Sequence, residues 1–280
     1  VLANLLRFRQ YYKNLLIFIP LFFGGKLFDI DLLILTLIGF FALCAVSSSS
    51  YIINDLVDAE KDKLHPEKKN RPLASGEVAR KPAFLLAIVL FLSGAGIALR
   101  IDFYFGLLAI ALVANTIMYS FWFKKEVILD LHSIAINYVF RALAGFNFIM
   151  HMFSPWILVL VFVAALFLVV EKRHSELALN NNTTTVILSP QKTYSKEFLT
   201  ALRNIFFGIL FLSYILYCVF GRSTTFLLSA PFFSYTALRF FYLLQNNPEL
   251  GRKTEIFFTD KTLLFGFILW LFVCFGLLYL

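Results

Sequence analysis

The sequence predicts an all-α protein, a polytopic membrane bundle of about nine transmembrane helices. Two observations carry this fold class. Hydrophobic residues make up 60% of the 280 residues and charged residues only 15%, and several apolar runs approach the roughly 20 residues that a helix needs to cross a bilayer. The runs cover residues 14–25, 32–53, 82–100, 103–121, 128–150, 155–171, 200–220, 223–244 and 261–280. We therefore expect one transmembrane domain over residues 1–280.

The connections between the runs predict the orientation in the membrane. Lys and Arg are concentrated in alternate connections, and Lys26, Arg100 and Arg222 are the exceptions when Arg141 is set aside as intramembrane. The positive-inside rule then predicts a cytoplasmic N-terminus and cytoplasmic polar loops. These loops also explain the net charge of +8, so we do not expect a nucleic-acid partner.

The stretch before the first run carries polar residues at helical spacing. Arg9 and Lys13 are one turn apart, and so are Gln10 and Asn14. This pattern is typical of an interfacial helix that touches lipid headgroups, and equally of a segment that binds a substrate. Both interpretations stay open at this point.

The second run ends in a stretch, Tyr51–Gly76, that gathers acids and bases. Asp55, Asp58 and Asp62 follow one another at i, i+3 and i+7, which puts three carboxylates on one helical face, and Asn54 lies one turn before Asp58. Three acids on one face repel one another unless a cation lies among them. Because Mg2+ prefers carboxylate and phosphate oxygens, we predict that these aspartates hold Mg2+ on a substrate phosphate.

Basic residues follow the acidic face closely along the chain. Lys68, Lys69 and Arg71 supply donors that bind anions, so the predicted metal and an anion site lie near each other. His65 precedes Pro66, and no second histidine lies at a ligand spacing. We expect His65 to shape the loop instead of binding a metal.

The fifth run contains ionisable residues inside an apolar segment. Asp130, Asn137 and Arg141 are spaced at i, i+7 and i+11 and share one face of a regular helix. An arginine is costly in a membrane, and such residues usually face a cavity or a partner. Asp–Arg pairing between helices and contact with an anionic substrate are the two interpretations.

The sixth run ends in a second charged cluster, Glu171–Glu176. We expect this cluster to point into the same cytoplasmic layer as the acidic face. A solvated helix end is the simpler interpretation of the same residues.

Motifs of other chemical classes are absent from the sequence. There is no nucleophile with an adjacent base, no GxxxxGK[ST] and no GxGxxG. Cys44, Cys218 and Cys274 lie inside apolar runs without metal-ligand spacing and indicate no disulfide framework. The sequence therefore favours a reaction that needs only a metal ion on the leaving group and charged side chains to stabilise it. Loss of diphosphate is such a reaction.

The stretch Asn54–Asp62, NDLVDAEKD, resembles the NDxxDxxxD motif of the UbiA superfamily of intramembrane prenyltransferases. Within that superfamily the chain is most similar to the decaprenyl-phosphate phosphoribosyltransferases, which continue the motif into HPxKxxRPxAxG. The residues that match this extension are His65, Pro66, Lys68, Arg71, Pro72, Ala74 and Gly76. Weaker matches are Arg7, Gln10, Lys13 and Asn14, then Tyr119, Ser120, Lys124, Leu129 and Asp130, then Arg141, Ala142, Ala144 and Gly145, and then Lys172, Arg173, His174, Glu176 and Leu177.

The resemblance implies a UbiA-like fold and an enzyme that transfers 5-phosphoribose from phosphoribosyl diphosphate to a polyprenyl phosphate with Mg2+-assisted loss of diphosphate. It implies that Asp55, Asp58 and Asp62 are catalytic and bind the metal. The substrate-binding residues that it implies are Lys13, Asn14, Asn54, Lys68, Arg71, Lys124, Asp130, Arg141, Lys172, Arg173 and Glu176. It also implies a multi-pass protein among the lipids of a prokaryotic inner membrane, with its active site at the cytoplasmic face, and it leaves homo-oligomers open.

One departure from the prenyl-transferring enzymes of the superfamily bears on the choice of substrate. Those enzymes usually carry a second aspartate-rich motif near the end of the sixth helix, where this chain has EKRHSEL. Lys172 and Arg173 suit a substrate with phosphates at both ends better than a second carboxylate-bound metal. Prenyl transfer to an aromatic acceptor is the alternative, and a non-catalytic transporter or scaffold is the second alternative.

Overall fold

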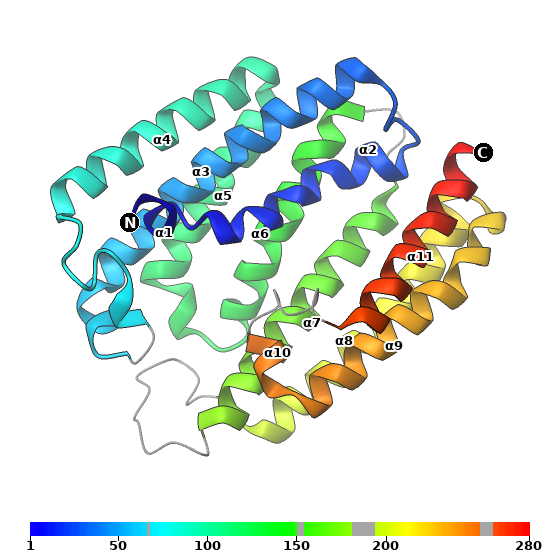
Figure 1. Ribbon diagram of the computed structural model, residues 1–280. Coiled ribbons are helices and arrows are strands. Elements are labelled where there is room, and N and C mark those ends of the chain that lie inside the picture. The colour runs from blue at the N-terminus through cyan, green and yellow to red at the C-terminus, as the bar shows by residue number, and fades with distance from the viewer. Residues whose placement is uncertain (66–67, 150–153, 181–193, 253–259) are drawn as a thin grey trace. The chain divides into compact units, whose positions relative to one another are not determined.

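The computed structural model describes residues 1–65, 68–149, 154–180, 194–252 and 260–280 (Figure 1). Within these ranges the chain forms helices and no strand, which confirms the all-α membrane bundle. The chain divides into two compact units, Val1–Phe153 and Ser154–Leu280. The expectation of a single domain stays a prediction.

The N-terminal unit is built around four long helices. Its elements are α1 (Leu2–Leu5), the 3-10 helix η1 (Phe8–Phe18), α2 (Ile19–Phe23), α3 (Ile30–Lys63), η2 (Lys68–Asn70), α4 (Arg80–Ile101), α5 (Phe103–Phe121), η3 (Phe123–Lys125), α6 (Leu129–Phe146) and η4 (Asn147–Ile149). Figure 1 shows α4 beside α3, and both η1 and α2 pack against α6. The N-terminal stretch therefore lies against the helices that carry the predicted site.

α3 is long enough to carry its charged end out of the apolar layer. It begins at Asp29, whose carboxylate accepts a hydrogen bond from the Leu32 backbone N–H at 3.2 Å. Its 34 residues correspond to about 50 Å at 1.5 Å per residue, whereas the hydrocarbon core of a bilayer is about 30 Å thick. The last turns, with Asp55, Asp58 and Asp62, can therefore reach the membrane surface.

Small residues let the helices of the N-terminal unit pack closely. A methyl group on Gly94 of α4 would lie 2.8 Å from the carbonyl oxygen of Ala42 in α3. A methyl group on Gly145 of α6 would overlap the carbonyl oxygen of Ile17 in η1. Such close backbone contacts are typical of membrane helices. The apolar core of this region comprises Ile17, Ala42, Leu43, Val46, Ala98, Phe105, Ala109, Leu112, Val113 and Ala144.

The C-terminal unit is also helical. Its elements are α7 (Pro155–Asn180), α8 (Lys196–Leu216), the π-helix η6 (Tyr217–Arg222), the 3-10 helix η7 (Thr224–Ser229), α9 (Ala230–Asn246), α10 (Pro248–Arg252) and α11 (Lys261–Tyr279). Ser195 caps α8 by accepting from the Phe198 N–H at 3.1 Å, and Asp260 caps α11 by accepting from the Leu263 N–H at 2.7 Å. The hydrogen bond from Arg239 to Asp260, together with this cap, lowers the pKa of the Asp260 carboxyl.

Seven helices in the described ranges are long and apolar enough to cross a membrane, so the predicted count of nine is not confirmed. The first run, 14–25, forms η1 and α2, which are short helices instead of a regular span. The fifth run forms α6, in which Asp130, Asn137 and Arg141 reduce the hydropathy. The seven helices cover Ile30–Lys63, Arg80–Ile101, Phe103–Phe121, Pro155–Ala178, Lys196–Arg222, Thr224–Asn246 and Lys261–Tyr279.

We predict that Gly145→Ala destabilises the protein, because the added methyl group would push η1 away from α6. Overpacking of this kind costs about 1–3 kcal/mol. Gly96→Ala in α4 is the matched control, since nothing lies within 4 Å of a methyl group at that position. Thermal unfolding in detergent should show a lower melting temperature for Gly145→Ala than for Gly96→Ala, and equal melting temperatures would contradict this packing.

Candidate active site

Two of the three motif aspartates share one arginine. Asp55 and Asp62 lie near the end of α3 and are only 3% and 5% exposed. Nη1 of Arg71 donates to Asp55 at 2.9 Å and to Asp62 at 2.6 Å. Arg7 donates to the same oxygen of Asp55. The two carboxylates are therefore neutralised by guanidinium groups of the protein itself.

The third aspartate faces a lysine from the connection after α5. Nζ of Lys124 donates to Asp58 at 2.7 Å. Near Lys124 in the sequence, the hydroxyl of Ser120 in α5 donates to the side-chain oxygen of Asn54 in α3 at 2.8 Å. These two contacts fasten the end of α5 and the following turn to the acidic end of α3.

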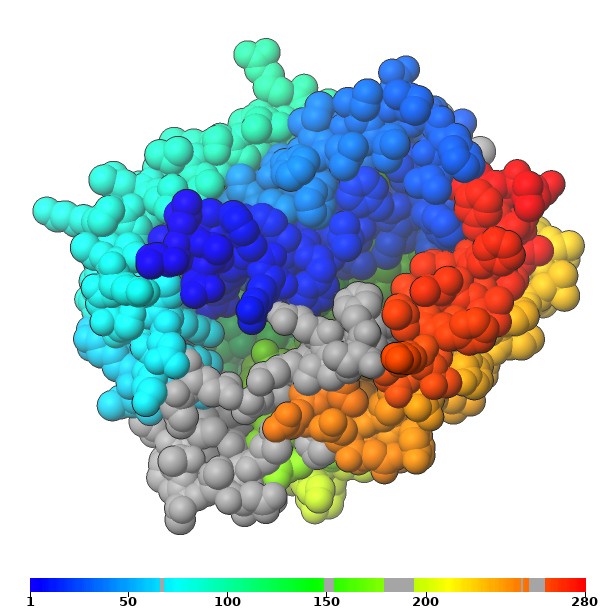
Figure 2. All heavy atoms as spheres, viewed as in Figure 1, coloured from blue at the N-terminus to red at the C-terminus, as the bar shows by residue number. Residues whose placement is uncertain are grey.

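Arg7 reaches this site from the start of the chain. Figure 2 shows the dark-blue N-terminal residues beside the cyan residues that follow α3, and Leu5 packs there with Ile52 and Leu73 in one apolar cluster. Arg7 has a φ of 54°, a left-handed conformation that non-glycine residues seldom adopt, at the point where α1 turns into η1. Its guanidinium also lies 5.2 Å from the centre of the Tyr51 ring. Arg7 was not among the predicted binding residues, and its place in the matched N-terminal stretch was the available signal.

Arg141 of α6 forms a second cluster, with residues nearer the middle of α3, and is 4% exposed. Its Nε donates to the side-chain oxygen of Asn14 at 2.7 Å, and its terminal nitrogens donate to the Asn137 carbonyl at 2.7 Å and to the Ser47 hydroxyl at 3.4 Å. Asn14 also accepts from Ser47 at 3.2 Å and donates to the Cys44 sulfur at 3.2 Å. The structure thus brings together two predicted binding residues, Asn14 and Arg141.

Asp130 and Lys13 both belong to the N-terminal unit, Asp130 at the start of α6 and Lys13 in η1. Asp130 is 2% exposed in the first turn of α6, where the helix dipole favours an acid. The Lys13 ammonium lies 5.9 Å from the centre of the Tyr138 ring, and the guanidinium carbon of Arg141 lies 6.0 Å from the same centre. Lys13 and Arg141 therefore approach a common aromatic ring.

Lys68 lies where the loop after α3 turns into η2. Its backbone N–H donates to Nδ1 of His65 at 3.4 Å. This contact agrees with the predicted loop-shaping role of His65. Pro66, which belongs to the matched extension, lies outside the described residues.

Lys172, Arg173 and Glu176 lie on α7 of the C-terminal unit. Lys172 is exposed, and Arg173 pairs with Glu176 at 3.3 Å. Glu171 is 1% exposed and lies 3.7 Å from Arg203 of α8, so the solvated-end interpretation fits Lys172 but not Glu171. The pair of Glu171 and Arg203 was not predicted, although an arginine inside the seventh apolar run is a signal in itself.

The motif aspartates fit Mg2+ that is bound together with phosphate groups. In the part of the chain that the structure describes, no three His, Cys, Asp or Glu side chains converge to hold a metal by themselves. Mg2+ is usually held by one or two carboxylates, with substrate phosphates and waters as its other ligands. Asp55, Asp58 and Asp62 supply hard oxygens on consecutive turns, and Arg71 and Lys124 donate hydrogen bonds to Asp62 and Asp58 from groups that can also donate to a phosphate.

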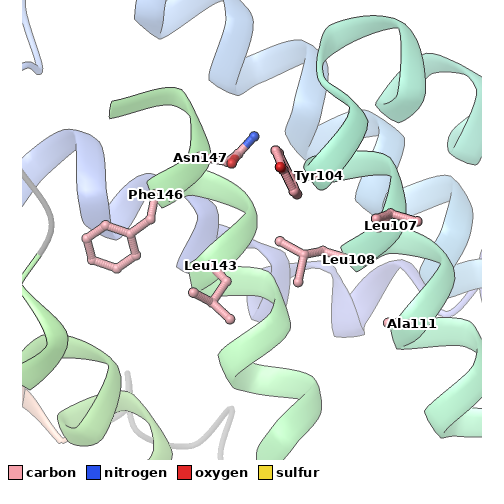
Figure 3. A pocket seen from close by; sticks show the side chains of 7 residues that line it. All are labelled: Tyr104, Leu107, Leu108, Ala111, Leu143, Phe146 and Asn147. Carbon is pink, nitrogen blue, oxygen red and sulfur yellow. The ribbon is translucent and has the colours of Figure 1, made fainter. Parts of the chain in front are cut away.

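An apolar cavity of about 480 Å³ lies between α5 and α6. In Figure 3 Leu108 of α5 faces Leu143 of α6, and Tyr104 faces Asn147. The complete lining is Tyr104, Leu107, Leu108, Ala111, Leu143, Phe146 and Asn147. Since none of these side chains is charged, the cavity offers no group that would bind a phosphate by charge.

The site thus lies in a helical membrane bundle in which one helix ends in acids that are paired with cations from other segments, an arrangement that is compatible with a membrane-embedded transferase. The model of the UbiA prenyltransferase family matches residues 15–260, and the chain belongs to this family. The family predicted from the NDxxDxxxD motif is thereby confirmed.

Curated relatives include enzymes of one branch of the family. The chain is 28% identical over 198 residues to decaprenyl-phosphate phosphoribosyltransferase of Mycobacterium tuberculosis, covering 69% of this chain and 66% of the relative. It is 30% identical over 202 residues to the protein of the same name in Mycolicibacterium smegmatis, covering 71% and 64%. An uncharacterized protein of Sinorhizobium fredii is 37% identical over 171 residues, covering 61% and 33%. The chain thus spans less than two thirds of the length of these relatives.

Solved structures share the fold over nearly the whole chain. The structure of a UbiA homolog from Archaeoglobus fulgidus bound to GPP and Mg2+ matches with a TM-score of 0.72 at 18% identity, covering 98% of this chain and 99% of that chain. The same homolog bound to DMAPP and Mg2+ matches with a TM-score of 0.66 at 19% identity, covering 98% of both. At such identities the similarity shows the fold alone.

We predict that Asp55→Asn lowers the stability of the ligand-free protein, because Arg7 and Arg71 would then face a neutral amide at a buried position. Leaving a buried polar partner unsatisfied costs about 1–3 kcal/mol. Glu60→Gln is the control, because Glu60 pairs with Lys63 and Arg80 at the exposed surface, where ion pairs contribute little. Melting temperatures measured in one detergent should fall for Asp55→Asn alone, and an equal fall for both variants would contradict the buried network.

Proposed function

We propose that the protein transfers 5-phosphoribose from phosphoribosyl diphosphate to a polyprenyl phosphate, with Mg2+-assisted loss of diphosphate. The observation that carries the proposal is the placement of three cations, Arg7, Arg71 and Lys124, directly against the motif aspartates. A site with both sets of charges can hold a metal and phosphates together. The phosphoribosyltransferases among the relatives support the choice of donor.

Donor binding in this proposal opens the internal ion pairs. Asp55, Asp58 and Asp62 would hold Mg2+, while Arg71 and Lys124 exchange their aspartate partners for diphosphate oxygens. The carboxylates are already neutralised in the ligand-free protein, so that neither the metal nor the diphosphate gains much by binding alone. We therefore expect the two to bind cooperatively, each raising the affinity of the other by the same factor.

The transfer exchanges one C–O bond for another at the anomeric carbon. The bond from this carbon to the diphosphate oxygen breaks, and its electron pair leaves with the diphosphate. An oxygen of the acceptor phosphate forms the new bond, and because that phosphate is already ionised near neutral pH, no general base is needed. Arg7, Arg71 and Lys124 stabilise the charge on the departing diphosphate, and bound Mg2+ supplies additional charge neutralisation.

The basic end of α7 favours a phosphoribosyl donor over a prenyl donor. Lys172 and Arg173 stand where a second set of metal-binding acids would be expected for a prenyl diphosphate, and cations suit the additional phosphate of phosphoribosyl diphosphate. The charge distribution along the chain further supports a site at the cytoplasmic face of a prokaryotic inner membrane, with the N-terminus on the same side. Prenyl transfer to an aromatic acceptor remains the alternative, since the UbiA homolog of similar fold is bound to GPP and Mg2+.

The direct test is incubation of the purified protein in detergent with labelled phosphoribosyl diphosphate, polyprenyl phosphate and Mg2+. Label should enter the lipid phase and should disappear from it when EDTA is present. Prenylation of an aromatic acceptor from prenyl diphosphate, without label transfer, would overturn the choice of donor. A protein without any Mg2+-dependent product would instead fit a transporter or scaffold.

We predict that Lys124→Met lowers the rate of label transfer by about 10²–10³-fold, the loss seen when one donor to a developing negative charge is removed. Lys125→Met is the matched control, because Lys125 is exposed and adjacent in sequence. Asp58→Asn, which alters the partner of Lys124, should abolish turnover while the protein stays folded. Equal initial rates for the two lysine variants would contradict the assigned role of Lys124.

A further inference from the structure

Arg141 is a buried cation that no carboxylate contacts within the described ranges. Its hydrogen bonds go to the neutral oxygens of Asn14, Asn137 and Ser47. A guanidinium has five N–H donors, so these bonds leave both its charge and part of its donor capacity for another group. Because a charge among membrane helices is costly without a counter-charge, residues of this kind usually serve an ion or a ligand.

The surroundings of Arg141 differ from those of the cations at the aspartates. Arg7, Arg71 and Lys124 each contact an aspartate. Near Arg141 lies another cation, because the Lys13 ammonium and the Arg141 guanidinium carbon lie 5.9 and 6.0 Å from the centre of the Tyr138 ring. An anion that binds beside both groups is attracted by two positive charges.

The Arg141 cluster is also distinct in position from the aspartates. Ser47, which contacts Arg141, precedes Asp55 by eight residues on α3, and this spacing corresponds to about 12 Å along the helix axis. Hydrogen bonds join atoms only about 3 Å apart. One phosphate group at Ser47 and Arg141 therefore cannot also be the group bound at Asp55.

We propose that Arg141, together with Lys13, forms a second anion site that binds a phosphate monoester, separate from the diphosphate at the aspartates. This inference rests on the proposed function, in which the donor carries a phosphate at each end and the acceptor carries one. The 5-phosphate of the donor and the phosphate of the polyprenyl acceptor share the required chemistry. Asn14 and Ser47 orient the guanidinium with neutral oxygens and so preserve its charge for the ligand.

The test is a thermodynamic cycle in which one side chain of the protein and one phosphate of the ligand are removed, singly and together. Dissociation constants are measured in nanodiscs with Mg2+ for two ligand pairs, phosphoribosyl diphosphate against ribose 1-diphosphate, and polyprenyl phosphate against polyprenol. Each pair is compared on the wild type, on Arg141→Gln and on Arg100→Gln. Arg100 is exposed in the last turn of α4, so its variant removes the same charge away from the cluster.

In the wild type, removal of the relevant phosphate should weaken binding about 10- to 100-fold, the range expected for hydrogen bonds between charged groups. Arg141→Gln should abolish this discrimination, and Arg100→Gln should retain it. Loss of discrimination in the donor pair identifies the 5-phosphate as the bound group, and loss in the acceptor pair identifies the lipid phosphate.

Asn14→Asp tests the same site with Arg141 in place. The new carboxylate would pair with Nε of Arg141, where the amide oxygen now lies 2.7 Å away. The ligand-free protein should then keep or raise its melting temperature, whereas its discrimination for the phosphate should fall. A purely structural Arg141 would leave that discrimination unchanged in every folded variant.

Unchanged discrimination in both Arg141→Gln and Asn14→Asp would overturn the second anion site and leave the proposed function intact. A wild-type protein that does not bind phosphoribosyl diphosphate at all would overturn both.

Discussion

The N-terminal unit depends on the neutralisation of charge in an apolar environment. The aspartates at the end of α3 are neutralised by Arg7 from the start of the chain, by Arg71 from the loop after α3, and by Lys124 from the turn after α5. Each pair fastens a separate segment onto α3. Because an unpaired buried charge costs several kcal/mol, the local arrangement of these segments and the chemistry of the site rest on the same ion pairs.

Much of the fold follows from local sequence patterns. The apolar runs 82–100 and 103–121 correspond closely to α4 and α5, because a continuous apolar stretch of this length is helical whatever packs around it. The run 14–25 does not form one regular membrane-spanning helix. Pro20 interrupts it at the start of α2, and the residues before α2 form a 3-10 helix. The acidic face was likewise predictable, since the periodicity of a helix is a local property.

The partners of the acids were not predictable in the same way. Arg7 and Asp55 are separated by 48 residues, and Lys124 and Asp58 by 66 residues. Such contacts depend on how helices pack, which the spacing of residues in one segment does not determine. The buried Glu171 and Arg203 were missed for the same reason, because an acid at a helix end and an arginine in the next apolar run indicate a pair only once α7 and α8 lie together.

Membership of the UbiA prenyltransferase family indicates a membrane transferase. The positions of the charged side chains are the basis for proposing its substrate. Because the cations at the aspartates are already paired with them, we expect a metal and a diphosphate to bind at this site together. The most direct measurement is the affinity of the purified protein for Mn2+, a paramagnetic substitute for Mg2+, by electron paramagnetic resonance with and without phosphoribosyl diphosphate. We expect weak Mn2+ binding to the protein alone and much tighter binding when phosphoribosyl diphosphate is present. Equally tight Mn2+ binding in both conditions would contradict joint binding of metal and diphosphate at the aspartates.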